Sequence, residues 1–207
     1  MVFDPSVPDV NNNDFAKRDW SSSEFSSVIK INREAHPRAP MPRGLGFTMV
    51  GKVDADHAAD TVTRRSRTGF IVYLNSAPIY WFSKKQTSVE TSSFGSEFIA
   101  MKQLCEYLRG LRYKLQMMGI PCEGPAYIYG DNQSVLANTT VPESTLKKKS
   151  SSLAYHLIRE GVALDEWRTA YVNTHDNESD LLTKVLPFGE KRRGFVRKVL
   201  HHIYGNA

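Results

Sequence analysis

The chain has 207 residues, enough for one domain of roughly 100–150 residues with appendages or for two small domains. Its net charge of +5 and pI near 9.2 fit a surface that binds polyanions, although many other proteins are mildly basic. With only two cysteines, the chain has neither a disulfide framework nor the ligand spacing of a zinc site. No stretch approaches the roughly 18 apolar residues of a membrane helix, and the N-terminus lacks the pattern of a secretory signal. We therefore expect an intracellular protein without a membrane partner, with Cys105 and Cys122 reduced.

The first 45 residues predict irregular structure. They contain five prolines and several polar runs, and they show no sustained helical or strand period. We interpret residues 1–45 as a linker, in which Phe15, Trp20 and Phe25 are the side chains able to pin parts of it to a surface.

Three strands and a long helix follow. Residues 46–53 are rich in apolar side chains, and residues 68–74 and 79–82, separated by a short turn, are typical of a hairpin. The long helix is expected to begin at Ser92 or Ser93 and to end at Gly119. Its apolar face consists of Phe94, Phe98, Met101, Cys105, Leu108 and Leu115.

The second half of the chain continues this alternation. It predicts a strand over 126–129, helical turns over 133–138, a helix over 153–167, a strand over 169–172, a short helix over 177–184 and a basic amphipathic helix over 189–204. A helix that follows three strands makes the fourth strand parallel to one of them. The sequence therefore predicts an α/β fold with a mixed five-stranded sheet flanked by helices, in a domain spanning 46–187 with a basic C-terminal helix in 188–207.

Four acidic residues flank these elements. Asp54 ends the first strand, Glu97 lies near the start of the long helix, Asp131 follows the fourth strand, and Asp180 lies in the last short helix. Active sites of α/β sheets gather at the carboxyl ends of strands, so we expect these carboxylates to converge there. Each acid also has an ordinary explanation as a turn residue, a cap or a partner of the helix dipole, and Asp56 competes with Asp54.

Clustered carboxylates suit the hydrolysis of a phosphodiester. The reaction needs an activated water, a clamp on the phosphate and a stabilised leaving oxygen, which two Mg²⁺ ions about 3.5–4 Å apart can supply. Mg²⁺ prefers carboxylate and water oxygens. Without metal, such a cluster repels itself, and some of its pKa values should be raised.

Around these acids the chain carries an ordered set of short motifs: VDADHA, RRSRTGFIVYLN, IYWFSKKQTSVETSS, SEFIAM, IYGDNQSVL, YHLIRE and YVNTHDNESDLLTKVLP. Each motif is weak alone, but the ordered set over residues 46–190 resembles the ribonuclease H region of copia-type retrotransposon Pol polyproteins. Two departures are KKKSSS at 147–152, where the family has a KHID-like stretch, and His57, where it often has Trp. They put local substrate contacts in doubt more than the chemistry.

The resemblance implies a ribonuclease H-like fold that cleaves the RNA strand of RNA–DNA hybrids during reverse transcription, with two Mg²⁺ ions for which Mn²⁺ may substitute. It implies Asp54, Glu97, Asp131 and Asp180 as the catalytic, metal-binding acids, with His175 as a possible auxiliary in product release or proton transfer. Residues 1–45 then correspond to the connection after a reverse transcriptase, which makes that enzyme a possible partner; this chain carries no polymerase motif. The resemblance also implies a location in a cytoplasmic particle or the nucleus.

Polar and basic residues near these acids predict the contacts to the hybrid. The candidates in its minor groove are Ser93, Ser96, Asn132, Gln133 and Ser134, and the candidates for its phosphates are Lys84, Lys85, Arg64, Arg65, Arg67 and Lys147–Lys149. A solvated basic face is the competing interpretation of the cations. The basic C-terminal helix fits either nucleic acid or a partner protein.

Two other functions compete with this hypothesis. One is a non-catalytic ribonuclease H-fold module, decayed or reused, that binds nucleic acid or a reverse transcriptase. The other is an integrase on the same fold, which is disfavoured because integrases place their Glu after two Asp residues, whereas Glu97 lies between Asp54 and Asp131.

Overall fold

The computed structural model describes residues 10, 15, 17–29, 39–145 and 152–199. Its strands are β1 (Met49–Asp56), β2 (Arg67–Leu74), β3 (Ala77–Lys85), β4 (Ala126–Gly130) and β5 (Trp167–Tyr171). Its helices are α1 (Ser26–Ile29), α2 (Ser93–Met117), α3 (Gln133–Thr140), α4 (Ser152–Ala163), α5 (Asp180–Thr183) and α6 (Glu190–Val199).

The strands form a five-stranded sheet in the order β3-β2-β1-β4-β5. β1 pairs antiparallel with β2, and β2 pairs antiparallel with β3. The crossover through α2 returns the chain to the other side of β1, where β4 pairs parallel with β1 and β5 parallel with β4. The predicted mixed five-stranded sheet is confirmed.

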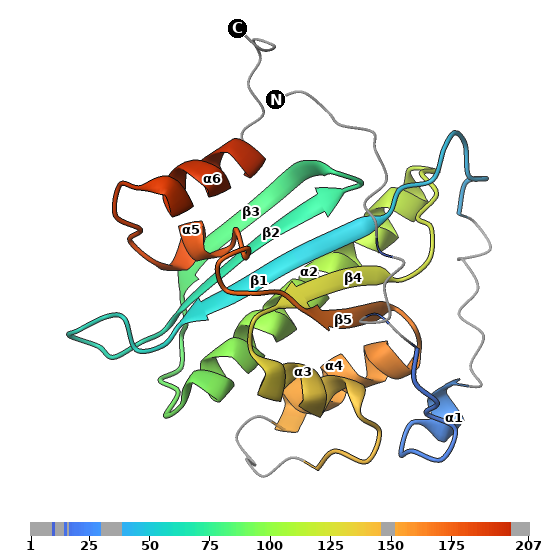
Figure 1. The fold of residues 1–207 in the computed structure, drawn as a ribbon. Coiled ribbons are helices and arrows are strands. Elements are labelled where there is room, and N and C mark those ends of the chain that lie inside the picture. The colour runs from blue at the N-terminus through green and yellow to red at the C-terminus, as the bar shows by residue number, and fades with distance from the viewer. Residues whose placement is uncertain (1–9, 11–14, 16, 30–38, 146–151, 200–207) are drawn as a thin grey trace, which may run out of the picture.

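Helices cover both faces of this sheet, with α2 on one face and α5 and α6 on the other (Figure 1). Toward α2, Val53 lies in the main core together with Phe98. On the opposite face, Val50 belongs to a smaller cluster that Leu182 of α5 and Val199 of α6 cover. Because side chains of a strand alternate between the two faces of the sheet, β1 contributes residues to both clusters. Within the described ranges, none of the helices has the length and apolar character of a membrane span.

Several element boundaries differ from the prediction. Asp54 lies within β1 rather than after it, because pairing with β2 continues to Asp56 opposite Arg67. α4 ends earlier than residue 167, since Asp165 has the left-handed φ of 56° that breaks the helix and Trp167 opens β5. α5 is shorter than the predicted 177–184, and the predicted end of the last helix at 204 lies outside the described residues.

The long helix agrees with its prediction. Ser92 caps α2 by accepting a hydrogen bond from the Gly95 amide at 3.2 Å, and Gly119, with a φ of 73°, follows its end. Its predicted apolar residues are buried or partly buried in the core. The helix therefore presents one face to the sheet along its whole length.

Part of the segment that was predicted to be irregular contributes to the core. Trp20 and Phe25 belong to the main core cluster, and α1 adds one helical turn there. Trp20 also stacks on the guanidinium of the buried Arg159, whose centre lies 4.7 Å from its ring. Phe15 packs on the opposite face. These aromatic side chains pin the segment to the sheet as predicted, whereas a domain boundary at residue 45 stays a prediction.

Replacing Trp20 with Ala should lower the free energy of unfolding by about 3–5 kcal/mol, because the change removes a buried aromatic side chain and leaves a cavity. Urea denaturation followed by circular dichroism measures the change. Leu45→Ala is the matched control, since Leu45 is 89% exposed and should alter stability by less than about 0.5 kcal/mol. Equal stability of the Trp20→Ala variant and the wild type would show that the segment does not pack in solution.

Candidate metal centre

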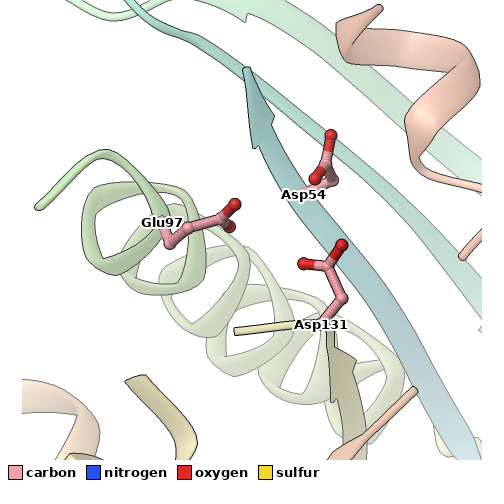
Figure 2. Close-up of side chains that lie close together, drawn as sticks. All are labelled: Asp54, Glu97 and Asp131. Carbon is pink, nitrogen blue, oxygen red and sulfur yellow. The ribbon is translucent and has the colours of Figure 1, made fainter. Parts of the chain in front are cut away.

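Three of the four predicted acids converge at the carboxyl ends of β1 and β4. Asp54, Glu97 and Asp131 each offer a carboxylate oxygen, and these oxygens all lie within 4.8 Å of one another. Figure 2 shows the three carboxyl groups pointing toward a common space, Glu97 from α2 and the two aspartates from the strand side. Asp56, the competitor of Asp54, is not part of this group.

The fold fixes the position of each acid through the element that carries it. β1 and β4 are parallel neighbours, with Lys52 opposite Tyr129, so Asp54 and the residue that follows β4 end at the same edge. The start of α2 is tied to the sheet by Gln86, whose side-chain amide donates to the Ser96 carbonyl at 2.8 Å and to the Thr68 hydroxyl at 3.1 Å. Glu97 therefore has little freedom to move away from the aspartates.

Burial and mutual repulsion oppose the ionisation of two of these acids. Burial raises the pKa of Asp54 to about 6, although Lys184 and the Thr183 hydroxyl offset part of the effect. Burial, followed by the charges of Asp54 and Asp131, raises the pKa of Glu97 to about 9. Glu97 is therefore protonated at neutral pH unless a cation compensates the charge of its carboxylate.

Asp180, the fourth predicted acid, has different partners. Its carboxylate is buried and accepts from the ammonium groups of Lys184 and Lys191, each at 2.6 Å. Lys184 also lies 3.3 Å from Asp54, so it bridges the two aspartates. Burial acts to raise the pKa of Asp180, but hydrogen bonds from the two lysines outweigh it and leave that pKa below its usual range. Asp180 is thus adjacent to the three-carboxylate group but neutralised by lysines.

A glycine in β2 allows α5 to bring Asp180 this close. A Cβ atom added at Gly69 would lie 2.5 Å from Thr183 Cγ2, 2.9 Å from Leu182 Cβ and 3.1 Å from the Ser179 carbonyl oxygen. Any side chain at this position would push α5 away from the sheet. Gly69 therefore allows α5, which carries Asp180, to pack closely against β2.

The sequence analysis did not identify the residues that hold these carboxylates. Thr183 donates a hydrogen bond to Asp54, and Thr174 donates to Asp131 at 2.9 Å. Lys184 follows Asp180 at the i+4 spacing of a helix face, which was a usable signal. Thr183, Thr174 and Lys191 gave no such signal, because each lies in a different element from the acid that it contacts.

The predicted minor-groove residues occupy the starts of α2 and α3. Gln133 and Ser134 are exposed beside Asp131, and Ser93 is exposed at the start of α2. The Asn132 side chain caps α3 by accepting from the Ser134 and Val135 amides. Ser96 is buried and donates its hydroxyl to the Ser93 carbonyl at 2.9 Å, which turns this group inward.

The remaining candidates lie around the same edge. Lys84 and Lys85 are exposed at the end of β3, and Lys85 is paired with Asp60. His175 is exposed in the loop after β5, next to the threonine that bonds Asp131. Lys147–Lys149 lie outside the described residues. Nucleic-acid contact by all these residues stays a prediction.

The donor set fits a hard divalent cation. Each of the three converging residues contributes carboxylate oxygens, the ligand type that Mg²⁺ and Mn²⁺ accept, and the described residues place no thiol or imidazole within this group. The raised pKa values of Asp54 and Glu97 mark a site where added positive charge would be stabilising.

No family model matches the chain. It is 38% and 35% identical over 146 residues to the retrovirus-related Pol polyproteins from transposons RE2 and RE1 of Arabidopsis thaliana, and 31% identical over 137 residues to that from transposon TNT 1-94 of Nicotiana tabacum. These alignments cover 70%, 70% and 66% of the chain. The chain spans only 10% of the length of each relative.

Solved structures share the fold at low identity. The N-terminal RNase H domain of rv2228c from Mycobacterium tuberculosis superposes with a TM-score of 0.52 at 11% identity, covering 67% of this chain and 91% of that one. RNase H1 from Halobacterium salinarum gives 0.51 at 14%, covering 66% and 94%, and LC11-RNase H1 in complex with an RNA/DNA hybrid gives 0.52 at 11%, with the same coverage. The chain is therefore homologous to one segment of the Pol polyproteins of copia-type transposons, and it has the ribonuclease H fold.

Proposed function

We propose that the chain hydrolyses the RNA strand of RNA–DNA hybrids with two bound divalent cations, Mg²⁺ or Mn²⁺. The observation that carries the proposal is the convergence of Asp54, Glu97 and Asp131 within 4.8 Å on a ribonuclease H fold. The relationship to Pol polyproteins and the hybrid bound to a solved structure of the same fold support this substrate.

Asp54, Glu97 and Asp131 would hold the cations, with Asp180 contributing once its lysine contacts are exchanged. Bound divalent cations supply an attacking water of lowered pKa and neutralise charge on the scissile phosphate. Thr183 and Thr174 keep the carboxylates of Asp54 and Asp131 oriented through their hydrogen bonds. The protein thus contributes a rigid, negatively charged cradle.

The residues around the cradle position the substrate. Gln133 and Ser134, exposed next to Asp131, can exchange hydrogen bonds with 2′-hydroxyl groups, which distinguish RNA from DNA. His175 directly follows Thr174, which is hydrogen bonded to Asp131, so its imidazole can transfer protons or assist product release. A reverse transcriptase of the same polyprotein is the protein partner that the similarity to Pol polyproteins suggests.

One observation favours a second candidate, a ribonuclease H-fold module that binds hybrids without cutting them. Lys184 and Lys191 neutralise Asp180, so the fourth carboxylate already has two cationic partners without metal. If these ion pairs persist in the presence of metal, the site would lack one ligand. Cleavage assays separate the two candidates.

The purified chain should cleave a labelled RNA–DNA hybrid when Mg²⁺ or Mn²⁺ is present and not in EDTA. Asp131→Asn should lower the rate by at least about 100-fold, because it removes a metal-binding oxygen charge while keeping the shape of the side chain. Gel analysis of the RNA strand measures the rate. Glu106→Gln is the control, since it removes a carboxylate charge from an exposed side chain of α2 that lies outside the group. Metal-independent cleavage, or none by any form, would contradict the proposal.

Glu97→Gln should stabilise the metal-free chain at alkaline pH. The folded pKa of about 9 exceeds the usual value of 4.5, so the unfolded chain releases this proton first, and the stability of the wild type falls as pH rises through this window. We expect the variant to lose roughly 1–3 kcal/mol less between pH 5 and pH 8, measured by urea denaturation.

Mg²⁺ supplies the complementary measurement. It should stabilise the wild type more at pH 8 than at pH 5, because protons compete for the same oxygens, and it should stabilise Glu97→Gln less. Parallel pH profiles of the two proteins would show that Glu97 does not titrate within a buried acidic cluster.

A further inference from the structure

A hollow of about 550 Å³ lies beside the acidic group, between the β1–β2 loop (residues 57–66), the end of β3 and α5. We call it the loop hollow; its charged lining consists of Arg65, Arg67, Lys85, Asp56 and Asp60. Thr183 also lines it, and the hydroxyl of Thr183 is hydrogen bonded to Asp54. The loop hollow therefore adjoins the metal centre on its α5 side; Figure 1 shows the β1–β2 loop extending past the end of the sheet.

The cations of the loop hollow are not fully neutralised. Asp60 accepts from the Val62 and Thr63 amides at 3.0 and 2.7 Å and pairs with Lys85, so its charge is used within the loop. The Arg67 guanidinium donates to the Ser83 hydroxyl at 3.3 Å. Among the described residues, neither Arg65 nor Arg67 forms an ion pair with a carboxylate within 4.0 Å. Two guanidinium groups thus remain available to an anion.

The loop that carries Arg65 is ordered by its own hydrogen bonds. The Ala58 amide donates to the Ser66 hydroxyl at 3.1 Å, and the Arg64 amide donates to the Asp60 carbonyl at 2.8 Å. Because these bonds fix the backbone before a ligand arrives, little conformational entropy is lost on binding. A planar guanidinium matches two oxygens of a phosphate, so the preferred anion is a phosphate group.

We propose that the loop hollow binds a backbone phosphate of a nucleic-acid strand whose scissile phosphate lies at the acidic group. The inference rests on the proposed function for the identity of the ligand. A nucleic-acid strand carries one phosphate per about 3.4 Å of helix axis, so a strand bound at the acids presents further phosphates to its neighbourhood. The loop hollow then fixes the register of the strand relative to the carboxylates.

Fluorescence anisotropy with a labelled RNA–DNA hybrid tests this in EDTA, where binding is scored without cleavage. Arg65→Gln and Arg67→Gln should each weaken binding about 5- to 10-fold near 0.1 M salt and lower the slope of log K against log[salt] by about 1. Arg65→Lys, which keeps the charge but loses the fork, should lie between Arg65→Gln and the wild type.

Arg64→Asn is the matched control. The sequence made Arg64 a candidate for phosphate contact as well, but its side chain does not line the loop hollow, so this variant removes the same charge next to Arg65 and leaves the lining unchanged. Asn tolerates the φ of 55° at this position. We expect less than about a 2-fold change in affinity for this control. Thermal unfolding of each variant checks that Arg65, which is exposed, can be replaced without loss of the fold.

Equal losses in Arg64→Asn and Arg65→Gln would indicate a diffuse basic face and overturn the inference. Unchanged binding by Arg65→Gln, or no binding by the wild type, would also overturn it. Binding that depends on Arg65 and Arg67 in a chain that does not cleave hybrids would support the loop hollow and contradict the proposed nuclease function instead.

Discussion

The repulsion among three carboxylates is the constraint on which the rest of this structure depends. Asp54, Glu97 and Asp131 come from a strand, a helix and the end of a second strand, and their oxygens lie within 4.8 Å of one another. These elements cannot relax separately, because β1 and β4 are paired and Gln86 ties the start of α2 to the sheet. Burial, and after it the repulsion between neighbouring carboxylates, therefore appears as raised pKa values of Asp54 and Glu97 rather than as a wider spacing. Such a site binds positive charge, whether as a proton, a lysine ammonium group or a metal cation.

The chain itself provides such charge on one side only. Lys184 and Lys191 neutralise Asp180, and Lys184 reaches Asp54, whereas the described ion pairs include none to Glu97 or Asp131. A cation that binds among the three carboxylates would replace the proton on Glu97, while a cation at Asp180 would have to replace ammonium groups. The three-carboxylate group and Asp180 thus differ in what a metal must displace, although all four acids lie at one edge of the sheet. Removing water from paired charges is costly, and these lysine contacts limit that cost at Asp180.

The elements and the three converging acids could be predicted because each rests on a local pattern. Buried strands appear in the sequence as apolar runs, and the apolar residues of α2 recur with a helical period. The carboxyl ends of neighbouring parallel strands meet at one edge of the sheet. The contacts that hold the acids could not be predicted from such patterns. Lys191 lies on α6, and its pairing with Asp180 depends on how α6 packs against the sheet. Trp20 lies in a proline- and serine-rich setting, where composition indicates a linker and only three-dimensional packing places the indole on Arg159.

That packing has a consequence for the edge of the sheet. Phe15 contacts Tyr127 and Tyr129 on the face that α5 and α6 cover, whereas Trp20 lies in the core beneath the other face. Between them, Lys17 pairs at 3.4 Å with Asp165, just before β5. The segment therefore passes from one face to the other beside β5, an edge strand whose backbone groups would otherwise be open to pairing with another chain. Apolar contacts on both faces of the sheet therefore help to hold this segment beside β5.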